Sequence, residues 1–397
     1  MTDLQVSPRI RHARTAVVVA FLINGLCFAS WISRTPAVRD TLGLSSAQLG
    51  LLLLCVSGGS IAGLPLSGPI VHRLGARAAV LFGSLTVGVG LAGLGVALLF
   101  ASVPLAVPGL VLVGLGIGVW DVAMNVEGAD VERRLGRSLM PRLHAGFSLG
   151  TVAGAGIGAA AAAAGVPLSA QVFVVAILAP VSMAVATRYF VLDRAEPEEG
   201  ASRRSGVLTA WREPRTLLVG LMVLGFAFTE GSANDWMAVA MVDGYGTSEA
   251  VGAIGFGVFV AAMTVARMIG GAALERYGRV ATLRATAVLG LGGLLLVLLG
   301  GSAPVAMAGA VLWGFGAALG FPVGMSAAAD DPARAAVRVS VVSSIGYTAF
   351  LAGPPLIGLL AEHVGILSAL FVVVAALTLG LAASGASRPL PAATPRP

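Results

Sequence analysis

A single carboxylate interrupts one of the most apolar stretches of the chain. Asp121 follows the segment VGLGIGVW, in which every residue is small or apolar, and Asn125 comes four residues later. Because four residues make about one helical turn, the two polar side chains share a helix face. An acid in hydrocarbon is costly, so Asp121 has to face protein or water. The pattern predicts a proton-coupling site, and the alternative is a structural acid that bonds a neighbouring helix.

A second acid lies in a later apolar stretch with similar spacing. Glu230, in FTEGSANDW, is followed four residues later by Asn234, so these two side chains also share a helix face. Asp235 comes next and lies nearer to the end of the stretch. We predict that Glu230 is the second proton-coupling residue. The alternative for both acids is a cluster at a helix end that is exposed to water.

Several polar and aromatic residues recur at helical spacing and can contact a solute. Asn24, Phe28 and Trp31 fall on one face of the first apolar stretch, and Ser343 and Tyr347 share a face of a later one. An amide and an indole that face inward suit a polar ligand stacked on the indole. The alternative is ordinary helix–helix contact. The predicted substrate-binding residues are Asn24, Phe28, Trp31, Asn125, Asn234, Ser343 and Tyr347.

Arg34 lies at the end of the first apolar stretch, where a charge can form and break an ion pair, and it is predicted to act as a gate. Its separation from Asp121 along the helices is roughly 20 Å at the rise of an α-helix, which argues against a pair between these two residues. Asp235 or Glu230, at a similar depth in the second half of the chain, is the expected partner in an outer gate. The alternative is that Arg34 lies at the membrane surface, where its long side chain only extends its charge into water.

Membrane-spanning helices have to position these residues. Of the 397 residues 57% are hydrophobic and only 11% are charged. A soluble protein has about 25% charged residues, and a helix needs about 20 apolar residues to cross a bilayer. The composition therefore predicts an all-α membrane protein. Its twelve transmembrane helices are expected near residues 15–35, 48–71, 78–99, 105–128, 143–164, 168–191, 215–238, 249–273, 281–300, 303–326, 338–361 and 365–385.

The distribution of arginines predicts the orientation of the chain. With the N-terminus inside, only Arg34, Arg39 and Arg267 fall outside the cytoplasmic segments, and basic residues favour the cytoplasmic side. Both termini are therefore expected in the cytoplasm of a multi-pass protein of the cell inner membrane. The expected domains are an N-terminal six-helix half (1–192), a cytoplasmic linker (193–214), a C-terminal six-helix half (215–385) and a disordered tail (386–397).

The two halves repeat a short loop pattern. GPIVHRLGAR at residues 68–77 and GAALERYGR at residues 271–279 both read G-x-x-x-x-R-x-G. The second copy resembles G-x-x-x-D-R-x-G-R, the signature of the major facilitator superfamily, whereas His72 replaces the acid in the first copy. The resemblance implies two pseudo-symmetric halves and gating by loop charges; the alternative role of these charges is loop packing and topology. The loop-associated residues expected to gate are Arg73, Arg77, Arg267, Glu275, Arg276 and Arg279.

Longer stretches resemble one branch of that superfamily. WISRTPAVRDTLGLSSAQLG, DVAMNVEG, MPRLHAGFSLG, EGSANDW and IGYTAFLAGPPLIGLLAE look like the YbjJ-type permeases, which are relatives of the fucose permease. The fucose permease pattern G-x-x-E-T-A-x-N resembles GVWDVAMN, with Asp121 at its carboxylate and Asn125 at its asparagine. This resemblance implies proton coupling by Asp121. That permease has a second carboxylate in helix one, where this chain has Ile32.

Residues and resemblance together predict a secondary active transporter that moves a small polar, sugar-like solute by proton-coupled alternating access. The alternatives are a proton-driven efflux antiporter for an amphipathic compound and, from another class, a non-transporting membrane sensor or scaffold. No Walker loop is present, and we expect no enzyme activity, cofactor or metal. The expected partners are the solute, protons and membrane lipid, without nucleic acid, and the chain is expected to be a monomer.

Overall fold

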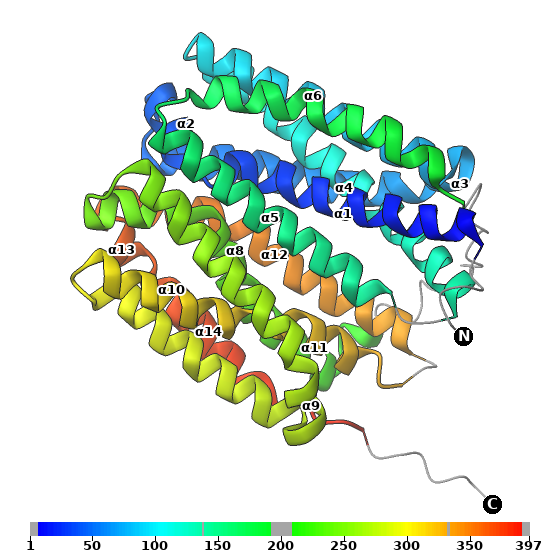
Figure 1. Ribbon diagram of the computed structural model, residues 1–397. Helices are drawn as coiled ribbons and strands as arrows, with labels where there is room; N and C mark the ends of the chain where they lie inside the picture. The colour runs from blue at the N-terminus through cyan, green and yellow to red at the C-terminus, as the bar shows by residue number, and fades with distance from the viewer. Residues whose placement is uncertain (1–6, 137–138, 192–208, 332–333, 391–397) are drawn as a thin grey trace, which may run out of the picture. The chain divides into compact units, whose positions relative to one another are not determined.

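The computed structural model describes residues 7–136, 139–191, 209–331 and 334–390, and the regular secondary structure in these ranges is entirely helical (Figure 1). Most of the predicted linker and tail lies outside the described residues. Ten helical stretches in the described ranges are long and apolar enough to cross a membrane. The helices are α1 (Pro8–Ile32), α2 (Thr35–Leu42), α3 (Ser46–Leu99), α4 (Val103–Leu135), α5 (Met140–Ala163), α6 (Leu168–Ala186), α8 (Pro214–Tyr245), α9 (Glu249–Leu299), α10 (Ala303–Ala317), α11 (Gly320–Ala328), α12 (Ala335–Val364), α13 (Ile366–Ala369) and α14 (Phe371–Ala383), with the short 3-10 helices η2 (Thr187–Tyr189) and η3 (Ser384–Ser387).

Two of these helices are much longer than one membrane crossing. α3 has 54 residues and α9 has 51, which is roughly 80 Å of helix against a hydrocarbon core of about 30 Å. Each is interrupted by one glycine with a non-helical backbone, Gly75 (φ 82°, ψ 163°) in α3 and Gly278 (φ 78°, ψ 166°) in α9. A residue with a side chain is strained at these angles, so the break requires glycine. Both glycines belong to the repeated loop pattern of the sequence.

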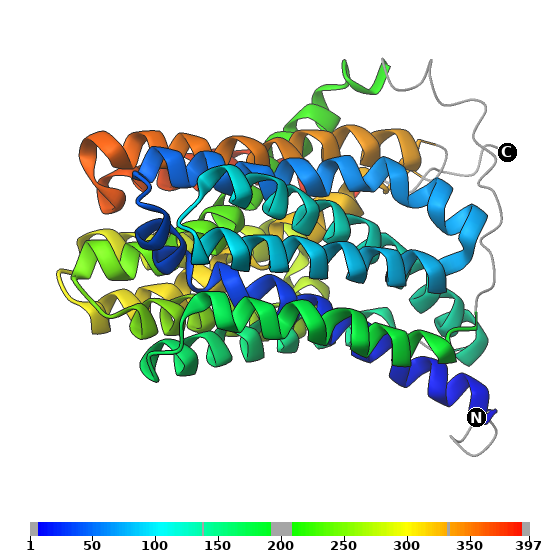
Figure 2. The same cartoon turned by 90° about the horizontal axis from the view of Figure 1, so that it is seen from above.

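The break at Gly75 reverses the direction of α3. Before the break α3 runs parallel to α4, and after it α3 runs antiparallel to α4. Figure 2 shows the reversal within this blue element. The close approaches that establish the two directions are Gly59–Val111 and Gly63–Leu115 before the break, and Gly83–Gly116 and Gly90–Gly109 after it. α3 therefore consists of two antiparallel arms.

α1 and α5 lie side by side because glycines of α5 face α1 (Figure 1). The carbonyl oxygen of Leu22 occupies the place that a side chain on Gly150 would take, and Gly158 approaches the hydroxyl of Ser33 in the same way. Small residues let helices approach closely where lipid provides no hydrophobic driving force. The stretch AGAGIGAAAAAAG, which is small rather than strongly apolar, thus forms a helix that packs on α1.

By its internal contacts the chain forms two compact units. Unit 1 comprises Met1–Glu198, Asn234–Ala261 and Pro354–Ile366. Unit 2 comprises Glu199–Ala233, Ala262–Gly353 and Leu367–Pro397. Unit 1 therefore includes the end of α8, the start of α9 and the end of α12, which come from the second half of the sequence.

The helices overlap every stretch that the sequence predicts to cross the membrane. Two interruptions of the helices are not predicted by the sequence. A turn at Ser33 and Arg34 separates α2 from α1, and a bend at Ala318 and Leu319 separates α10 from α11. At both interruptions, backbone carbonyl groups lie beside charged side chains.

Candidate functional site

Asp121 is exposed in an otherwise covered part of α4. Between Leu112 and Gly128 it is the only exposed residue. Since a charged group in an apolar helix does not face lipid, its exposed surface has to face water inside the protein. Asn125 donates its side-chain N–H to the backbone carbonyl of Asp121 at 2.8 Å and to carboxylate oxygen Oδ1 at 3.4 Å. The shared face that the spacing predicts is therefore a direct contact.

His144 of α5 is close enough to Asp121 to interact with it electrostatically. Its Nδ1 contacts the carbonyl of Met140 at 3.0 Å, and its ring packs on Phe21 of α1 with 5.2 Å between the ring centres. Because Nδ1 is used within α5, Nε2 is the ring nitrogen that can face the carboxylate. His144 is also exposed. Unit 1 thus brings together a carboxylate and an imidazole ring.

Asn24 and Trp31 are buried in α1 without hydrogen-bond partners. Both residues are 1% exposed, and neither the amide of Asn24 nor the indole N–H of Trp31 meets a partner in the described part of the chain. Buried polar groups nearly always have a partner, so these two leave hydrogen-bonding capacity that a solute or water can use. Phe28, on the same face, and Asn234 of α8 are half-buried.

Arg34 is almost fully buried and binds three acceptors. Its Nε and Nη2 donate to the two carboxylate oxygens of Glu249 at 2.5 and 3.1 Å. Its Nη1 donates to Gln171 Oε1 and to the carbonyl of Val166, both at 3.0 Å. Gln171 is itself fixed by a bond from Nε2 to the carbonyl of Ser30 at 2.6 Å. These five residues, which all belong to unit 1, form the Arg34 cluster.

The Arg34 cluster corrects the expected partner of Arg34. Arg34 pairs with Glu249 at the start of α9, and not with Asp235. The reason is distance along α8. Asp235 lies ten residues before Tyr245, where α8 ends, which is about 15 Å at helical rise. The prediction that Asp235 is the gate partner of Arg34 is therefore wrong, and Glu230, the other expected partner, pairs with Arg267 within unit 2.

A second ion pair and a helix cap lie near the Arg34 cluster in unit 1. Arg39 of α2 pairs with Asp243 near the end of α8, with Nη2 and Oδ1 2.9 Å apart. The carboxylate of Glu362, near the end of α12, accepts the backbone N–H of Ala47 at 3.3 Å. A cavity of about 360 Å³ opens beside the Arg34 cluster. Charged groups therefore link helix ends from both halves of the sequence.

Glu230 pairs with Arg267 in unit 2. Nη2 of Arg267 donates to both carboxylate oxygens of Glu230 at 2.9 Å, and Nε donates to the carbonyl of Ala318 at 3.2 Å. Ala318 lies at the bend between α10 and α11, where a carbonyl can lack its helical partner. The Glu230 side chain is 16% exposed and that of Arg267 is 35% exposed. Arg267 thus connects α9 with Glu230 of α8 and with the bend between α10 and α11.

Ser343 and Tyr347 of α12 lie beside groups of α11. The ring of Tyr347 packs near Phe321 and Phe350, with ring centres 6.0 and 6.4 Å apart. The hydroxyl of Ser343 donates to the sulfur of Met325 at 3.2 Å. The helix face that the spacing predicts is therefore an aromatic surface in unit 2 with a hydroxyl one turn away.

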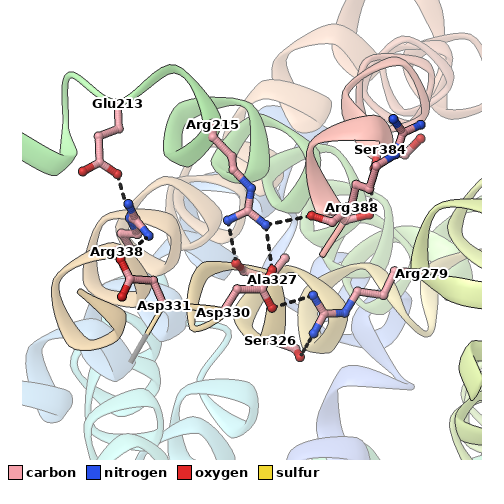
Figure 3. A network of polar contacts seen from close by, with 11 residues as sticks. Glu213, Arg215, Arg279, Ser326, Ala327, Asp330, Asp331, Arg338, Ser384 and Arg388 are labelled. Atoms are coloured by element: carbon pink, nitrogen blue, oxygen red, sulfur yellow. Dashed lines mark hydrogen bonds and ion pairs between the residues drawn. The ribbon is translucent and has the colours of Figure 1, made fainter. Parts of the chain in front are cut away.

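Asp330 joins two arginines in unit 2 (Figure 3). Its Oδ2 accepts Nη2 of Arg215 at 2.7 Å, and its Oδ1 accepts Nη1 of Arg279 at 2.7 Å. Arg279 also donates to Ser326 Oγ at 2.8 Å. These four residues form the Asp330 cluster, which connects the start of α8, the glycine break of α9 and the end of α11.

The Asp330 cluster involves only one of the loop charges expected to gate, Arg279. Glu275 is exposed, and Arg276 lies over the ring of the tyrosine that follows it, 5.2 Å from the ring centre. In the first copy of the loop Arg73 and Arg77 are exposed. Arg279 therefore makes a packing contact within one unit, and gating by the loop charges stays a prediction.

Glu213 forms further ion pairs beside the Asp330 cluster (Figure 3). It pairs with Arg338 at 2.7 Å. It also pairs with Arg334 at 2.5 Å and accepts the hydroxyl of Thr216 at 2.9 Å. Burial raises the pKa of Glu213, but these hydrogen bonds and the two positive charges outweigh it and hold the pKa below its usual range. Glu213 is therefore a charged anchor for the first turn of α12.

Comparison with known proteins identifies the family. The sequence profile described as Major Facilitator Superfamily matches residues 3–137, 138–332 and 236–396. The chain belongs to the Major Facilitator Superfamily. As a member of that superfamily it is a multi-pass membrane protein and a secondary transporter of small solutes, and it is not an enzyme.

Similar proteins include bacterial members of the Major Facilitator Superfamily. An uncharacterized MFS-type transporter of Yersinia pestis is 32% identical over 367 residues, which are 92% of this chain and 93% of the relative. The uncharacterized transporter y4wD of Sinorhizobium fredii is 33% identical, over 90% of this chain and 93% of the relative. The membrane protein MosC of Rhizobium meliloti is 27% identical, over 94% and 90%.

Two solved structures show the same superfamily fold. The nucleoside transporter NupG has a TM-score of 0.78 at 12% identity and covers 95% of this chain and 100% of its own chain. The fucose:proton symporter FucP of E. coli has a TM-score of 0.62 at 13% identity, with coverage of 95% and 98%. At these identities the likeness concerns the fold.

Within this superfamily fold, several residues join the site that sequence reasoning does not single out. Glu249 is the only acid of the predicted crossing 249–273, and Gln171 is the only amide of α6. Their isolation in apolar stretches is the signal that can mark them. Among the described residues no group of three or more His, Cys, Asp or Glu is placed to hold a metal ion.

Proposed function

We propose that the chain is a proton-coupled transporter of a small polar, sugar-like solute and works by alternating access. The observation that carries the proposal is Asp121, an exposed acid in an otherwise covered part of the apolar helix α4, beside His144. Such a group can be neutral in one transport state and charged in another, and its charged form resists movement through an apolar path. The printed titles of two similar structures support this, since one is a nucleoside transporter and the other a fucose:proton symporter.

The other site residues have proposed roles in the same cycle. Glu230 is the second protonatable group, and its ion pair with Arg267 supports a role that depends on charge. The unpartnered polar atoms of Asn24 and Trp31 support contact with a polar solute. The residues proposed to contact the solute are Asn24, Phe28, Trp31, Asn125, Asn234, Ser343 and Tyr347.

Arg34 and Glu249 are the proposed outer gate. Their bidentate ion pair links α1 and α9, and the pair between Arg39 and Asp243 links α2 and α8. In alternating access both pairs would separate when this end opens to solute. Proposed gating by Arg73, Arg77, Glu275, Arg276 and Arg279 rests on the family resemblance of their loops.

The proposed topology has twelve crossings in two six-helix halves. Because α3 and α9 each exceed two bilayer thicknesses and break at Gly75 and Gly278, each would cross twice. The arginine distribution supports cytoplasmic termini, and the bacterial relatives support the inner membrane. We further propose a monomer of the YbjJ-type branch, on the strength of the sequence stretches that resemble it.

The test is Asp121→Asn in proteoliposomes. A thermal-shift screen of sugars, sugar acids, nucleosides, amino acids and amphipathic drugs first identifies a solute that stabilises the purified protein. Asp121→Asn keeps the shape of the side chain and removes its titration, so proton-driven accumulation of that solute should be lost while binding persists. Asp130→Asn is the matched control in the same helix, because Asp130 pairs with Arg133 and Arg134, whose side chains are 74% and 48% exposed and have no proposed role in transport, and it should transport normally.

Two results would count against the proposal. Accumulation by Asp121→Asn with normal pH dependence would make Asp121 structural and move the coupling role to Glu230. A screen in which only amphipathic drugs stabilise the protein would favour the efflux antiporter instead.

A further inference from the structure

The ion pair of Glu230 and Arg267 lies far from the helix ends. Glu230 is near the middle of α8, 16 residues after Pro214 and 15 before Tyr245. Arg267 is 11 residues before the break at Gly278, which is roughly 16 Å at helical rise. Charges placed this deeply in apolar helices are costly and usually serve a function.

The exposed part of Arg267 does not face lipid. Val265, Met268 and Ile269 are 47%, 71% and 57% exposed apolar residues on the same helix, and they mark its lipid face. At about 100° per residue, Arg267 points roughly 150° away from the mean direction of these three side chains. Its side chain is 35% exposed, whereas that of Glu230 is 16% exposed. A solute in the aqueous path therefore meets the guanidinium more readily than the carboxylate.

The position of the guanidinium does not depend on Glu230 alone. Nε donates to the carbonyl of Ala318, and one nitrogen, Nη2, makes both bonds to Glu230. Nη1 donates to no group in the described part of the chain. An arginine held in this way keeps its place when its carboxylate partner leaves, and it has a free N–H for a second acceptor.

The negative charge of Glu230 and the positive charge of Arg267 balance each other. α10, α11 and α14 contain no charged or titratable residue, and in unit 2 α12 offers only Tyr347 and, in its first turns, Arg338. A monoanion that replaced the charge of Glu230 would keep the site neutral, whereas a dianion such as sulfate would leave it with an unbalanced buried charge, which is costly.

We propose that Arg267 binds the carboxylate of the transported solute and that Glu230 occupies this binding position when no solute is present. The inference rests on the proposed transport function and narrows its solute class to small monocarboxylates, such as sugar acids. When the solute carboxylate pairs with Arg267, the displaced Glu230 takes a proton from water. Arg267 then holds the solute carboxylate and Glu230 holds the proton, so both are carried together. The net charge of the site is zero before and after the exchange.

Binding to the purified full-length protein tests this inference with three matched pairs of probes. Lactate is compared with propane-1,2-diol, gluconate with sorbitol and glucuronate with glucose, and sulfate represents a dianion. At least one carboxylate should raise the unfolding midpoint while its neutral analogue does not. Arg267→Gln should weaken that binding at least tenfold, and Arg267→Lys should weaken it less. Arg212→Gln, at an exposed arginine outside the helices, should leave it unchanged.

Glu230→Gln gives the sharper result because it removes the internal competitor. It should tighten carboxylate binding by about tenfold and abolish proton uptake on binding. If Arg267→Gln does not fold because Glu230 is left unpaired, the double variant Arg267→Gln/Glu230→Gln has no charge at the site and should bind carboxylates no better than their neutral analogues.

The inference is overturned if no carboxylate stabilises either the wild type or Glu230→Gln. It is also overturned if sulfate or a neutral analogue binds as well as the carboxylate, or if Glu230→Gln weakens binding as much as Arg267→Gln does. A neutral solute whose proton-driven uptake requires Asp121 would leave the proposed function intact and remove only this inference. Carboxylate binding that requires Arg267, together with proton-driven uptake that does not require Asp121, would support this inference and remove the proposed coupling role of Asp121.

Discussion

The partners of Arg34 come from both halves of the sequence. Gln171 and Val166 lie in the same half of the sequence as Arg34, whereas Glu249 lies in the other half. Two N–H groups of the guanidinium meet the two oxygens of Glu249, and this bidentate geometry makes strong arginine–carboxylate pairs. Because the Arg34 side chain is only 4% exposed, loss of Glu249 leaves a buried charge with neutral acceptors alone.

Removal of Arg34 and removal of Glu249 should therefore not have additive effects. A double-mutant cycle with Arg34→Ala and Glu249→Ala, measured as unfolding free energy in detergent, should give a coupling of about 1–3 kcal/mol. The pair of Arg133 and Asp130 is the control, since the Arg133 side chain is 74% exposed, and its coupling should be below about 0.5 kcal/mol. Additivity at Arg34 and Glu249 would show that their contact is not sheltered from water.

Glu213 predicts a pH dependence of stability. Its pKa is held below the unfolded value of about 4.3 by Arg338, Thr216 and Arg334 against the effect of burial. A lowered pKa in the folded state contributes stability that is present above the unfolded pKa and is lost as the pH falls through the folded pKa. The unfolding midpoint should therefore fall below about pH 4, and Glu213→Gln should have a lower midpoint at pH 7 and a smaller further loss in acid. An equally steep loss in Glu213→Gln would place the acid-sensitive group elsewhere.

At the residue scale, the sequence predicts which charges are unusual but not which charges meet. Asp121, Glu230, Arg34 and Arg267 all stand out because each interrupts an apolar stretch, which is a local property. Pairing depends on where helix ends lie in space, so the partner of Arg34 could not be read from spacing. Depth estimated from helical rise was too coarse to separate Asp235 from a residue at the start of α9.

At the scale of elements, the close approach of α1 and α5 gives a direct test of packing. A Cβ on Gly150 would lie 1.9 Å from the carbonyl oxygen of Leu22, so Gly150→Ala forces the two backbones apart and should cost about 1–3 kcal/mol. Gly156→Ala is the matched control in the same helix, because nothing lies within 4 Å of its added carbon. It should be neutral or stabilising by up to about 1 kcal/mol. Unfolding midpoints in detergent compare the two, and equal effects would mean that α5 does not depend on this contact.

The helices themselves were predictable because twenty-residue apolar stretches leave the backbone no other way to satisfy its hydrogen bonds in lipid. The interruptions were harder to predict. Gly75 and Gly278 sit in a recognisable repeat. Pro322 of α11 lies four residues after Ala318 and has no backbone N–H for that carbonyl, so it favours the bend without fixing its geometry. Tertiary contacts, including the bond from Arg267, accompany that bend, and they are not visible in local sequence.

At the scale of the whole molecule, the arginine distribution predicts which chain segments face the outside. In a chain with Cys27 and Cys55 replaced by alanine, Asp40→Cys and Asp243→Cys should react with an impermeant thiol reagent in intact cells. Arg212→Cys should react only after permeabilisation, since it lies in the predicted cytoplasmic linker. Labelling of Arg212→Cys in intact cells would reverse the proposed orientation.

The way in which Arg34 is held has a consequence for the speed of gating. An ordered arginine side chain gives up conformational entropy worth about 1.5–2 kcal/mol. Gln171 and Val166 fix Arg34 independently of Glu249, so this entropy is lost once, when the chain folds. In each closing of the proposed gate only the Glu249 side chain then has to find its rotamer. A smaller entropic barrier makes closure faster than it would be between two freely rotating partners.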